Sequence, residues 1–455
     1  MNRAVSTRGL KSGGKAGWIV LLAVAVAVVA DTRFNPVGGK LRMLVLGLLP
    51  LLVLVAPNVG RTVRRSSGLG MTLGLIVLAG AVSSVACVAP ILGFLKLGFF
   101  VAVVVPLVTN RAAQEALLPG TRTHVWLNRG ANIILLLCLA QTVGVVGFVD
   151  NPNKLAAFAI VTLPWKLVLS GSGHRRTRLR ARIAIVLLFG ICVASHSRGA
   201  VGGFLISLIV FRYSGPARSV LTPIAVGAIL IVGLGLAVEM SPQLREYVYK
   251  DREQFLDDRR QTMLQDTMQY FRERPVLGYG FGLSWNVRPE HVEAVLRTGR
   301  LSWFVGEFGN STLAIMAGGG GMLLAAFGVF FVAVLRFVEG SFRNVCTTGT
   351  EQLVQRSLFG TMIGMLAYSQ VEGWLLSPLN WISVFFWLYV GMALRLASGP
   401  KAQARRATIE QKPIEEPGAL LAKAQRIAEG GNAEGGELKN EMGTRRENRD
   451  GRAES

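Results

Sequence analysis

Two arginines, Arg198 and Arg260, could bind a phosphate-bearing group. Arg198 stands in a short polar turn between apolar segments, and Arg260 lies in residues 251–274, which contain good helix formers and no Pro or Gly. A guanidinium stays charged at any working pH and binds phosphate through two parallel hydrogen bonds. Alternatively, Arg198 is a loop charge that extends to water. Arg260 would either snorkel to water or pair with Asp257 or Glu253.

The position of Arg260 on its predicted helix is unusual for a charged residue. Leu264, Met268 and Phe271 form an apolar stripe at helical spacing. At 100° per residue Arg260 falls on that stripe, whereas Arg259 lies about 100° around the helix. Amphipathic helices keep charges off the buried face, so we expect Arg260 to pair with an acid or to meet an anion at the membrane boundary.

A glycine-rich turn follows the predicted helix. The helix is expected to end before Pro275, and Gly278, Gly280 and Gly282 permit backbone conformations that other residues rarely adopt. The motif lacks the preceding strand and following helix of a nucleotide-binding fingerprint. It predicts a recognition turn or a simple reversal of the chain.

Two further side chains could act as a general base. His291 lies between Glu290 and Glu293, and is either a base or a surface residue. Glu372 could balance an arginine or accept a proton. The acidic residues show no metal-ligand spacing, so we expect neither a metal site nor another cofactor.

The composition places these residues in a membrane protein. The chain has 455 residues, of which 51% are hydrophobic and 17% are charged, against about a quarter charged in soluble domains. The formal charge of +22 comes mainly from short connections between apolar runs, which argues against a nucleic-acid partner. Of the four cysteines, three lie within apolar runs and are expected to behave as small hydrophobic residues.

The apolar runs predict an all-α, polytopic bundle of about twelve transmembrane helices. Basic residues cluster in alternate loops, so both termini are expected in the cytoplasm. The longest polar loop then lies outside, between the ninth and tenth spans. The predicted spans are residues 16–30, 41–56, 69–88, 91–109, 130–149, 155–170, 182–196, 199–213, 219–239, 311–335, 354–376 and 380–397.

This topology divides the chain into five parts. They are a cytoplasmic N-terminus at 1–15, spans one to nine within 16–240, an extracytoplasmic catalytic or recognition loop at 241–310, spans ten to twelve within 311–397, and a cytoplasmic tail at 398–455. The tail is rich in charge and glycine and poor in aromatic residues, so we expect it to be mostly disordered.

The chain resembles the O-antigen ligase and O-antigen polymerase superfamily of bacterial envelope glycosyltransferases over about residues 15–397. The resemblance rests on twelve spans, a Ser-Arg-Gly turn at Arg198, and a long outer loop after span nine. In that loop an arginine, a helix and a Pro-x-x-Gly-x-Gly motif precede an asparagine and a glycine-rich span. The matching residues are Arg260, Pro275, Gly278, Gly280, Asn310 and Gly318 to Gly321.

The resemblance implies a fold like that of C-type glycosyltransferases and a metal-independent, inverting transfer at the outer face of the bacterial cytoplasmic membrane. The donor would be an undecaprenyl-pyrophosphate-linked glycan, and the acceptor a glycan or a lipid-linked molecule. Arg198 and Arg260 would neutralise the departing diphosphate. Arg259, Pro275, Gly278, Gly280 and Asn310 would contribute to substrate binding.

One position departs from the family pattern. Ligases commonly carry a histidine, the candidate base, immediately before the asparagine, and here that residue is Gly309. The base would then be Glu307, His291 or Glu372, unless the protein is closer to a polymerase that relies on arginines, or is an inactive relative.

Two other functions are compatible with a polytopic membrane protein. A transporter or flippase of a lipid-linked or anionic substrate is the alternative, although such proteins commonly show repeated halves that this sequence lacks. The second of these functions is that of a scaffold protein acting through its tail, and such a protein would not require Arg260 on an apolar stripe.

Overall fold

The computed structural model describes most of the hydrophobic body of the chain. It covers residues 10–30, 67–87, 89–110, 121–149, 151–213, 258–283, 310–342, 349–377 and 380–397, with isolated positions at 32, 44, 48–51, 114 and 240. The chain divides into two compact units, Met1–Gly399 and Pro400–Ser455, and all described residues belong to the first.

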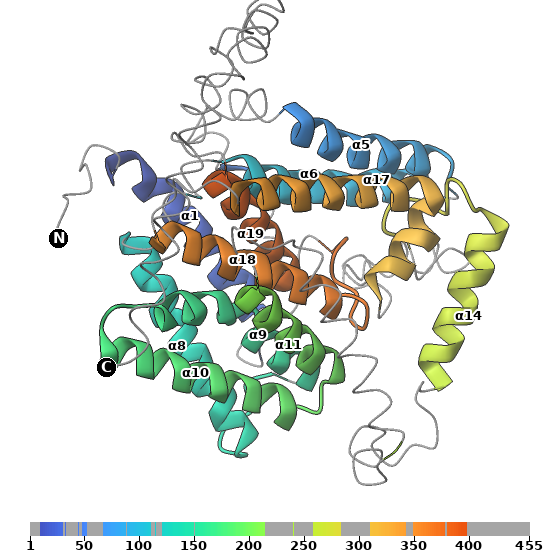
Figure 1. Cartoon of the computed structure of the whole chain (residues 1–455). Coiled ribbons are helices and arrows are strands. Elements are labelled where there is room, and N and C mark those ends of the chain that lie inside the picture. The colour runs from blue at the N-terminus through green and yellow to red at the C-terminus, as the bar shows by residue number, and fades with distance from the viewer. Residues whose placement is uncertain are drawn as a thin grey trace, which may run out of the picture. The chain divides into compact units, whose positions relative to one another are not determined.

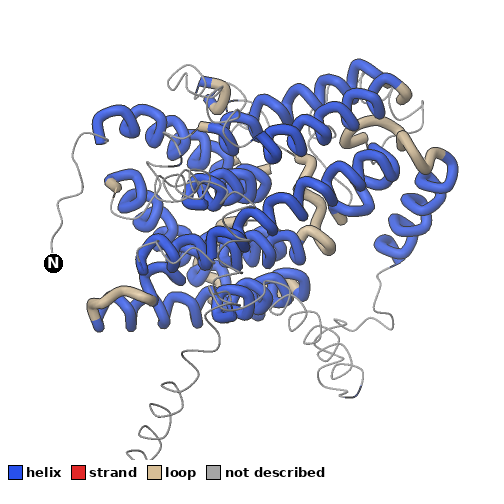
Figure 2. The backbone as a smooth tube through the Cα atoms, turned by 45° about the horizontal axis from the view of Figure 1, so that its top comes forward, coloured by secondary structure: helices blue, strands red, loops and turns tan. Residues whose placement is uncertain are grey.

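Every regular element among the described residues is a helix (Figures 1 and 2). The helices are α1 (Leu10–Val29), α5 (Ser67–Val85), α6 (Pro90–Thr109), α8 (Arg122–Thr142), α9 (Pro152–Ser170), α10 (Arg175–Ala194), α11 (Arg198–Tyr213), α14 (Asp258–Glu273), α17 (Ser311–Phe342), α18 (Gly349–Tyr368) and α19 (Trp381–Ala397). All except α14 overlap predicted spans, so the all-helical architecture is confirmed. The predicted spans at 219–239 and, apart from isolated positions, at 41–56 lie outside the described residues, so the total of twelve stays a prediction.

Several helices have the length and composition of membrane spans. Within the described part of the chain, three are long and apolar enough to cross a membrane, namely Pro90–Thr109, Thr123–Thr142 and Ser311–Val338. Shorter apolar helices occupy Lys15–Val29, Gly70–Val85 and Trp381–Ala397. Large apolar side chains also remain exposed on the outside of the bundle, among them Ile91, Leu136 and Val186. Such exposed apolar surface is expected where helices face lipid. The protein is therefore an integral membrane protein.

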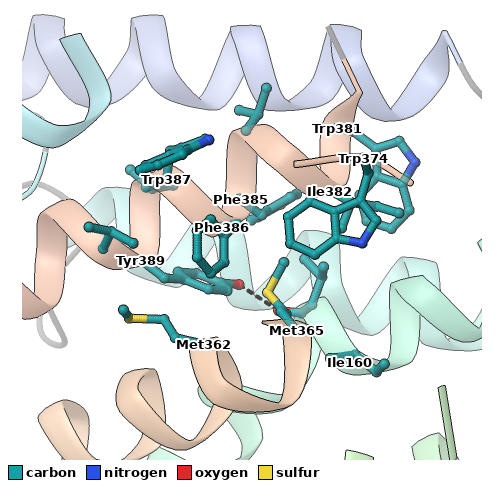
Figure 3. Close-up of a cluster of buried hydrophobic side chains, with 14 of the residues drawn as sticks. Ile160, Met362, Met365, Trp374, Trp381, Ile382, Phe385, Phe386, Trp387 and Tyr389 are labelled. Carbon is teal, nitrogen blue, oxygen red and sulfur yellow. Dashed lines mark hydrogen bonds between the residues drawn. The ribbon is translucent and has the colours of Figure 1, made fainter. Parts of the chain in front are cut away.

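The centre of the bundle is formed by α9 and α19, which are buried on nearly all sides. A helix that is apolar around its whole circumference belongs in such a position. Trp381 stacks on Phe158 with ring centroids 4.1 Å apart, and Trp387 meets Phe100 edge to face at 5.6 Å. Figure 3 shows Trp374, Trp381 and Trp387 among the side chains that gather around the first turns of α19.

Small residues let α11 and α18 approach each other closely. A Cβ atom on Gly203 would lie 2.6 Å from the Gly364 carbonyl, and one on Gly360 would lie 2.6 Å from the Ser207 carbonyl. Close backbone approach through small residues is a common means of helix association in membranes. The contact continues to the end of α18, where a Cβ on Gly199 would overlap Val371.

Several element boundaries differ from those predicted. α8 runs Arg122–Thr142, although the span was predicted at 130–149. α10 begins at Arg175, so the basic residues expected before the seventh span occupy its first two turns. α18 ends at Tyr368, although the span was predicted to run to residue 376. Hydrogen bonds to the start of α17 hold the residues after α18 in a non-helical path.

Candidate functional site

The chain from Pro275 to Gly282 forms a tight turn at the C-terminal end of α14. Three of its glycines have positive φ, namely Gly278 (62°), Gly280 (119°) and Gly282 (68°). Residues with a Cβ rarely adopt such angles, so the spacing of the glycines follows directly from the backbone path.

This turn is joined to α17 where α17 is broken. The break is at Gly320, which has φ 62° and ψ −162° inside an otherwise helical run. Four backbone hydrogen bonds connect the two segments: Tyr279 N–H to Ala317 O (3.0 Å), Gly280 N–H to Gly318 O (2.7 Å), Gly321 N–H to Pro275 O (2.7 Å) and Met322 N–H to Val276 O (3.1 Å). The turn thus satisfies backbone groups that the break releases from the helical ladder, which is essential away from water.

Side chains from α5 and α6 hold the joint from the other side. The Ser83 hydroxyl donates to the Gly318 carbonyl (2.8 Å), and the Lys96 ammonium donates to the Gly282 carbonyl (2.6 Å). Lys96 is 2% exposed. Phe281 is fully buried and meets Phe100 edge to face at 5.3 Å. The turn is therefore part of the packed bundle.

The joint attaches α14 to the bundle. The Arg274 guanidinium donates to the Ala86 carbonyl (2.8 Å) and lies 4.9 Å from the Tyr279 ring centroid. The Tyr279 hydroxyl donates to Glu273. Burial and this hydrogen bond raise the pKa of Tyr279 to about 12. In Figure 1, α14 runs crosswise to the long part of α17, on the side where α17 is broken, and Figure 2 shows the same arrangement.

Arg259 and Arg260 lie in the first turn of α14, and their side chains are outside the described residues. Along the predicted apolar stripe, Leu264 is 37% exposed. Among the side chains of α14 that the structure describes, Thr267 is the most buried, at 0%. Position 260 precedes Thr267 by seven residues, which is nearly two full turns, so the two positions share a face of the helix.

A second polar cluster lies where α9 and α11 begin and α18 ends. The Asn153 side-chain amide donates to the Glu372 carboxylate, and the Tyr368 hydroxyl donates to the Asn153 carbonyl (3.0 Å). Arg198 is half-buried and is the first residue of α11. Because the next residue, Gly199, packs against Val371, the Arg198 turn and Glu372 occupy the same end of the bundle.

The start of α17 fastens the chain that follows α18. The Ser311 hydroxyl accepts hydrogen bonds from Trp374 N–H (3.0 Å) and Leu375 N–H (3.1 Å), and Ser311 N–H donates to Ser369 O (2.8 Å). Asn310 caps α17 by accepting from Leu313 N–H (3.1 Å), and its amide donates to Gln370 O (2.6 Å). These bonds explain why the chain leaves the helix before Glu372.

The structure assigns geometric roles to several residues predicted from the sequence. Pro275 and Gly280 connect the turn after α14 to α17 through backbone hydrogen bonds, and Gly278 packs against Gly320. Asn310 joins α17 to the chain after α18. Arg198 and Glu372 lie at the same end of the bundle. Their roles toward a substrate stay predictions. The proximity of Arg198 to Arg260 also stays a prediction, and His291 and Glu307 lie outside the described residues.

Sequence reasoning missed Lys96 and Asn153 as parts of these clusters, and it named Gly320 only as part of the glycine-rich span Gly318 to Gly321. A lysine inside an apolar span is itself a clue to a polar partner. Asn153 has no comparable signature, because Asn before an apolar helix is common at helix starts.

The matched part of the chain includes the joint between the glycine turn and α17, and Arg198 from the second cluster. Asn153, Tyr368 and Glu372 lie outside it. Residues 183–335 match the family described as O-Antigen ligase. This segment contains Arg198, α14, the glycine turn and the break in α17. A comparison with curated proteins gives no match. The match over these residues supports the O-antigen ligase and polymerase superfamily, which the sequence motifs indicated.

Proposed function

We propose that the protein is a membrane glycosyltransferase of the O-antigen ligase or polymerase type. It would transfer or polymerise glycan from an undecaprenyl-pyrophosphate-linked donor on the outer face of the cytoplasmic membrane. The observation that carries this proposal is the joint between the glycine turn and α17, within the matched segment. The joint fixes the arginine-bearing helix α14 against the membrane-embedded bundle. A loop that served only to connect two spans would not require this attachment.

Arg198 and Arg260 would neutralise the diphosphate as it leaves. The bond that breaks leaves its electron pair on a phosphate oxygen, and fixed positive charges near that oxygen lower the barrier. Arg260 lies about 20 Å along α14 from its anchored end. In Figure 1, α14 extends from the joint toward the level of α11, which supports a shared site formed by the starts of both helices.

The outer location follows from charge and connectivity. Basic residues cluster in alternate loops, which lie at the opposite end of the bundle from the starts of α9 and α11. In that topology one side of the membrane holds the starts of α9, α11, α17 and α19 and the ends of α10 and α18. The hydrogen bonds among Asn153, Ser311 and the chain after α18 support this grouping.

The test is glycan transfer in a deletion strain complemented with single variants. Arg198→Ala and Arg260→Ala should each abolish transfer at normal expression. Arg212→Ala and Arg272→Ala are matched controls, because they remove exposed arginines from α11 and α14 outside the proposed site, and they should retain transfer. Normal surface polysaccharide in both site variants would contradict the proposal.

The glycan profile of the deletion strain itself separates the activities. Single repeat units accumulating on the lipid carrier would indicate a polymerase, whereas long chains on the carrier would indicate a ligase. Glycolipid trapped on the inner leaflet would instead indicate a flippase, and the glycosyltransferase proposal would be wrong.

A further inference from the structure

We propose that Glu372 is the residue that accepts the proton of the attacking hydroxyl, and that Asn153 is the positioning residue that orients its carboxylate. This inference rests on the proposed function and selects one base among those the sequence leaves open. It is carried by the contact between two residues that are 219 positions apart in the chain.

Asn153 is itself fixed by its neighbours. Its backbone N–H donates to the Asn151 side chain (2.9 Å), which caps α9, and its carbonyl accepts from the Tyr368 hydroxyl (3.0 Å). The remaining polar group, the side-chain amide, donates to one oxygen of Glu372. An amide held in this way presents its donor in a defined direction, as positioning residues in active sites do.

The backbone of Glu372 is equally constrained. Its N–H donates to the Tyr368 carbonyl (3.1 Å), and the chain two residues later is held by the Ser311 hydroxyl. Glu372 and Asn153 are each half-buried, so the carboxylate is neither sealed in the core nor free in solvent. A partly buried carboxylate with one oriented oxygen suits a general base that must meet a substrate.

The cluster also adjoins a candidate cation for the leaving group. Gly199 packs against Val371. Arg198 directly precedes Gly199, and Glu372 directly follows Val371, so the two charged residues are neighbours of a packed pair. An inverting transfer requires a base for the nucleophile and a cation for the leaving group in one site. This end of the bundle supplies both kinds of side chain.

The proposed step balances without any added reagent. The acceptor oxygen forms a bond to the anomeric carbon and gives its proton to the Glu372 carboxylate. The bond from that carbon to the diphosphate oxygen breaks, and its electron pair stays on the diphosphate. Configuration at the anomeric carbon is inverted.

The competing role for Glu372 is a counterion for an arginine, and Glu372→Gln distinguishes the two. The glutamine oxygen still accepts from Asn153, so the packing is retained, but its amide cannot take up a proton. The assay uses purified full-length protein and the lipid extract of the deletion strain as donor. We expect the transfer rate at saturating donor to fall at least about 100-fold, with the half-saturating donor concentration changed less than about 2-fold.

Two further variants test orientation and charge. Glu372→Asp keeps the charge but withdraws the carboxylate, and should lower the rate by about 10-fold or more. Asn153→Ala should lower the rate by about 10-fold, and should add nothing in a Glu372→Gln background, because its effect acts through Glu372. Glu351→Gln is the matched control, since Glu351 is an exposed carboxylate at the other end of α18, and it should keep the full rate.

The outcomes separate this inference from the proposed function. A Glu372→Gln protein with full transfer rate, beside inactive Arg198→Ala and Arg260→Ala proteins, would overturn the inference and leave the glycosyltransferase standing. A shift confined to the half-saturating donor concentration would assign Glu372 as a counterion and would also overturn it. A deletion strain with no accumulated lipid-linked glycan would contradict the proposed function itself.

Discussion

Gly278 and Gly320 meet backbone to backbone. A Cβ atom on Gly278 would lie 2.5 Å from Gly320 N, and both residues have φ of 62°. The first belongs to the turn after α14 and the second to the break in α17. Each glycine is therefore required by its own dihedral angles and by the space that the other occupies.

Gly320→Ala should weaken this joint. The positive φ and the overlap with the Val276 carbonyl, 2.5 Å from a Cβ at this position, together should cost about 2 kcal/mol or more. Thermal unfolding of detergent-purified protein measures the change. Gly328→Ala is the matched control in the same helix, because no atom lies within 4 Å of a Cβ there, and it should be neutral. Equal melting temperatures for both variants would contradict the required role of Gly320.

Lys96→Met should release the turn from α6. The substitution removes the ammonium that donates to Gly282, while an apolar side chain of similar length remains. Cys87 reports the change, because it is buried and lies 2.7 Å from a Cβ placed on Gly280. In a Cys346→Ser background, maleimide labelling of Cys87 should rise several-fold.

Lys166→Met provides the control for that experiment. Lys166 is also 2% exposed, but its ammonium donates to Asn128 and Asn132 on α8. Its loss should leave Cys87 unlabelled. Similar labelling in both variants would mean that loss of any buried lysine opens the bundle, and that Lys96 has no specific role at the turn.

Ser311→Ala should loosen the chain after α18. The hydroxyl accepts from two backbone N–H groups, and leaving buried donors unpaired should cost about 2 kcal/mol. Ser207→Ala is the comparison, because that buried hydroxyl donates only to Gly203 within its own helix. Chemical denaturation should show a clear loss for Ser311→Ala and little change for Ser207→Ala, and the reverse order would refute the assignment.

Tyr279→Phe should change how stability depends on pH. The neutral phenol donates to Glu273, and its pKa of about 12 lies above the ordinary value near 10. A group whose pKa is raised by folding stabilises the fold below its ordinary pKa and loses that contribution as pH rises through the folded value. The advantage of the wild type over Tyr279→Phe should therefore be constant up to about pH 10 and shrink toward pH 12. A pH-independent difference would show that the phenol does not titrate in this way.

Arg198→Lys and Arg260→Lys test the proposed phosphate contact. Lysine keeps the charge but binds as a point charge, without the paired donors of a guanidinium. Transfer should fall about 10- to 100-fold while remaining above that of the alanine variants. Lysine variants with the full transfer rate would show that charge alone is sufficient.

The sequence by itself determined the all-helical class and most helix positions, because long apolar runs in a membrane must satisfy their own backbone groups as helices. It also determined that the segment after α14 turns, since Gly278, Gly280 and Gly282 occur where only glycine tolerates the backbone. The family resemblance rested on the same local motifs and is supported by the match over residues 183–335.

Only the tertiary structure decided which distant groups meet. Nothing in the local pattern pairs Lys96 with Gly282, 186 residues later, or Asn153 with Glu372. Nor does it end α18 at Tyr368, because Trp374, Leu375 and Leu376 extended the predicted span across the more polar residues 369–373. Apolar length and helical period act within a segment, whereas the partner of each polar group depends on how the helices pack. That packing placed Ser311 against the chain on both sides of Glu372, at Ser369 and Trp374.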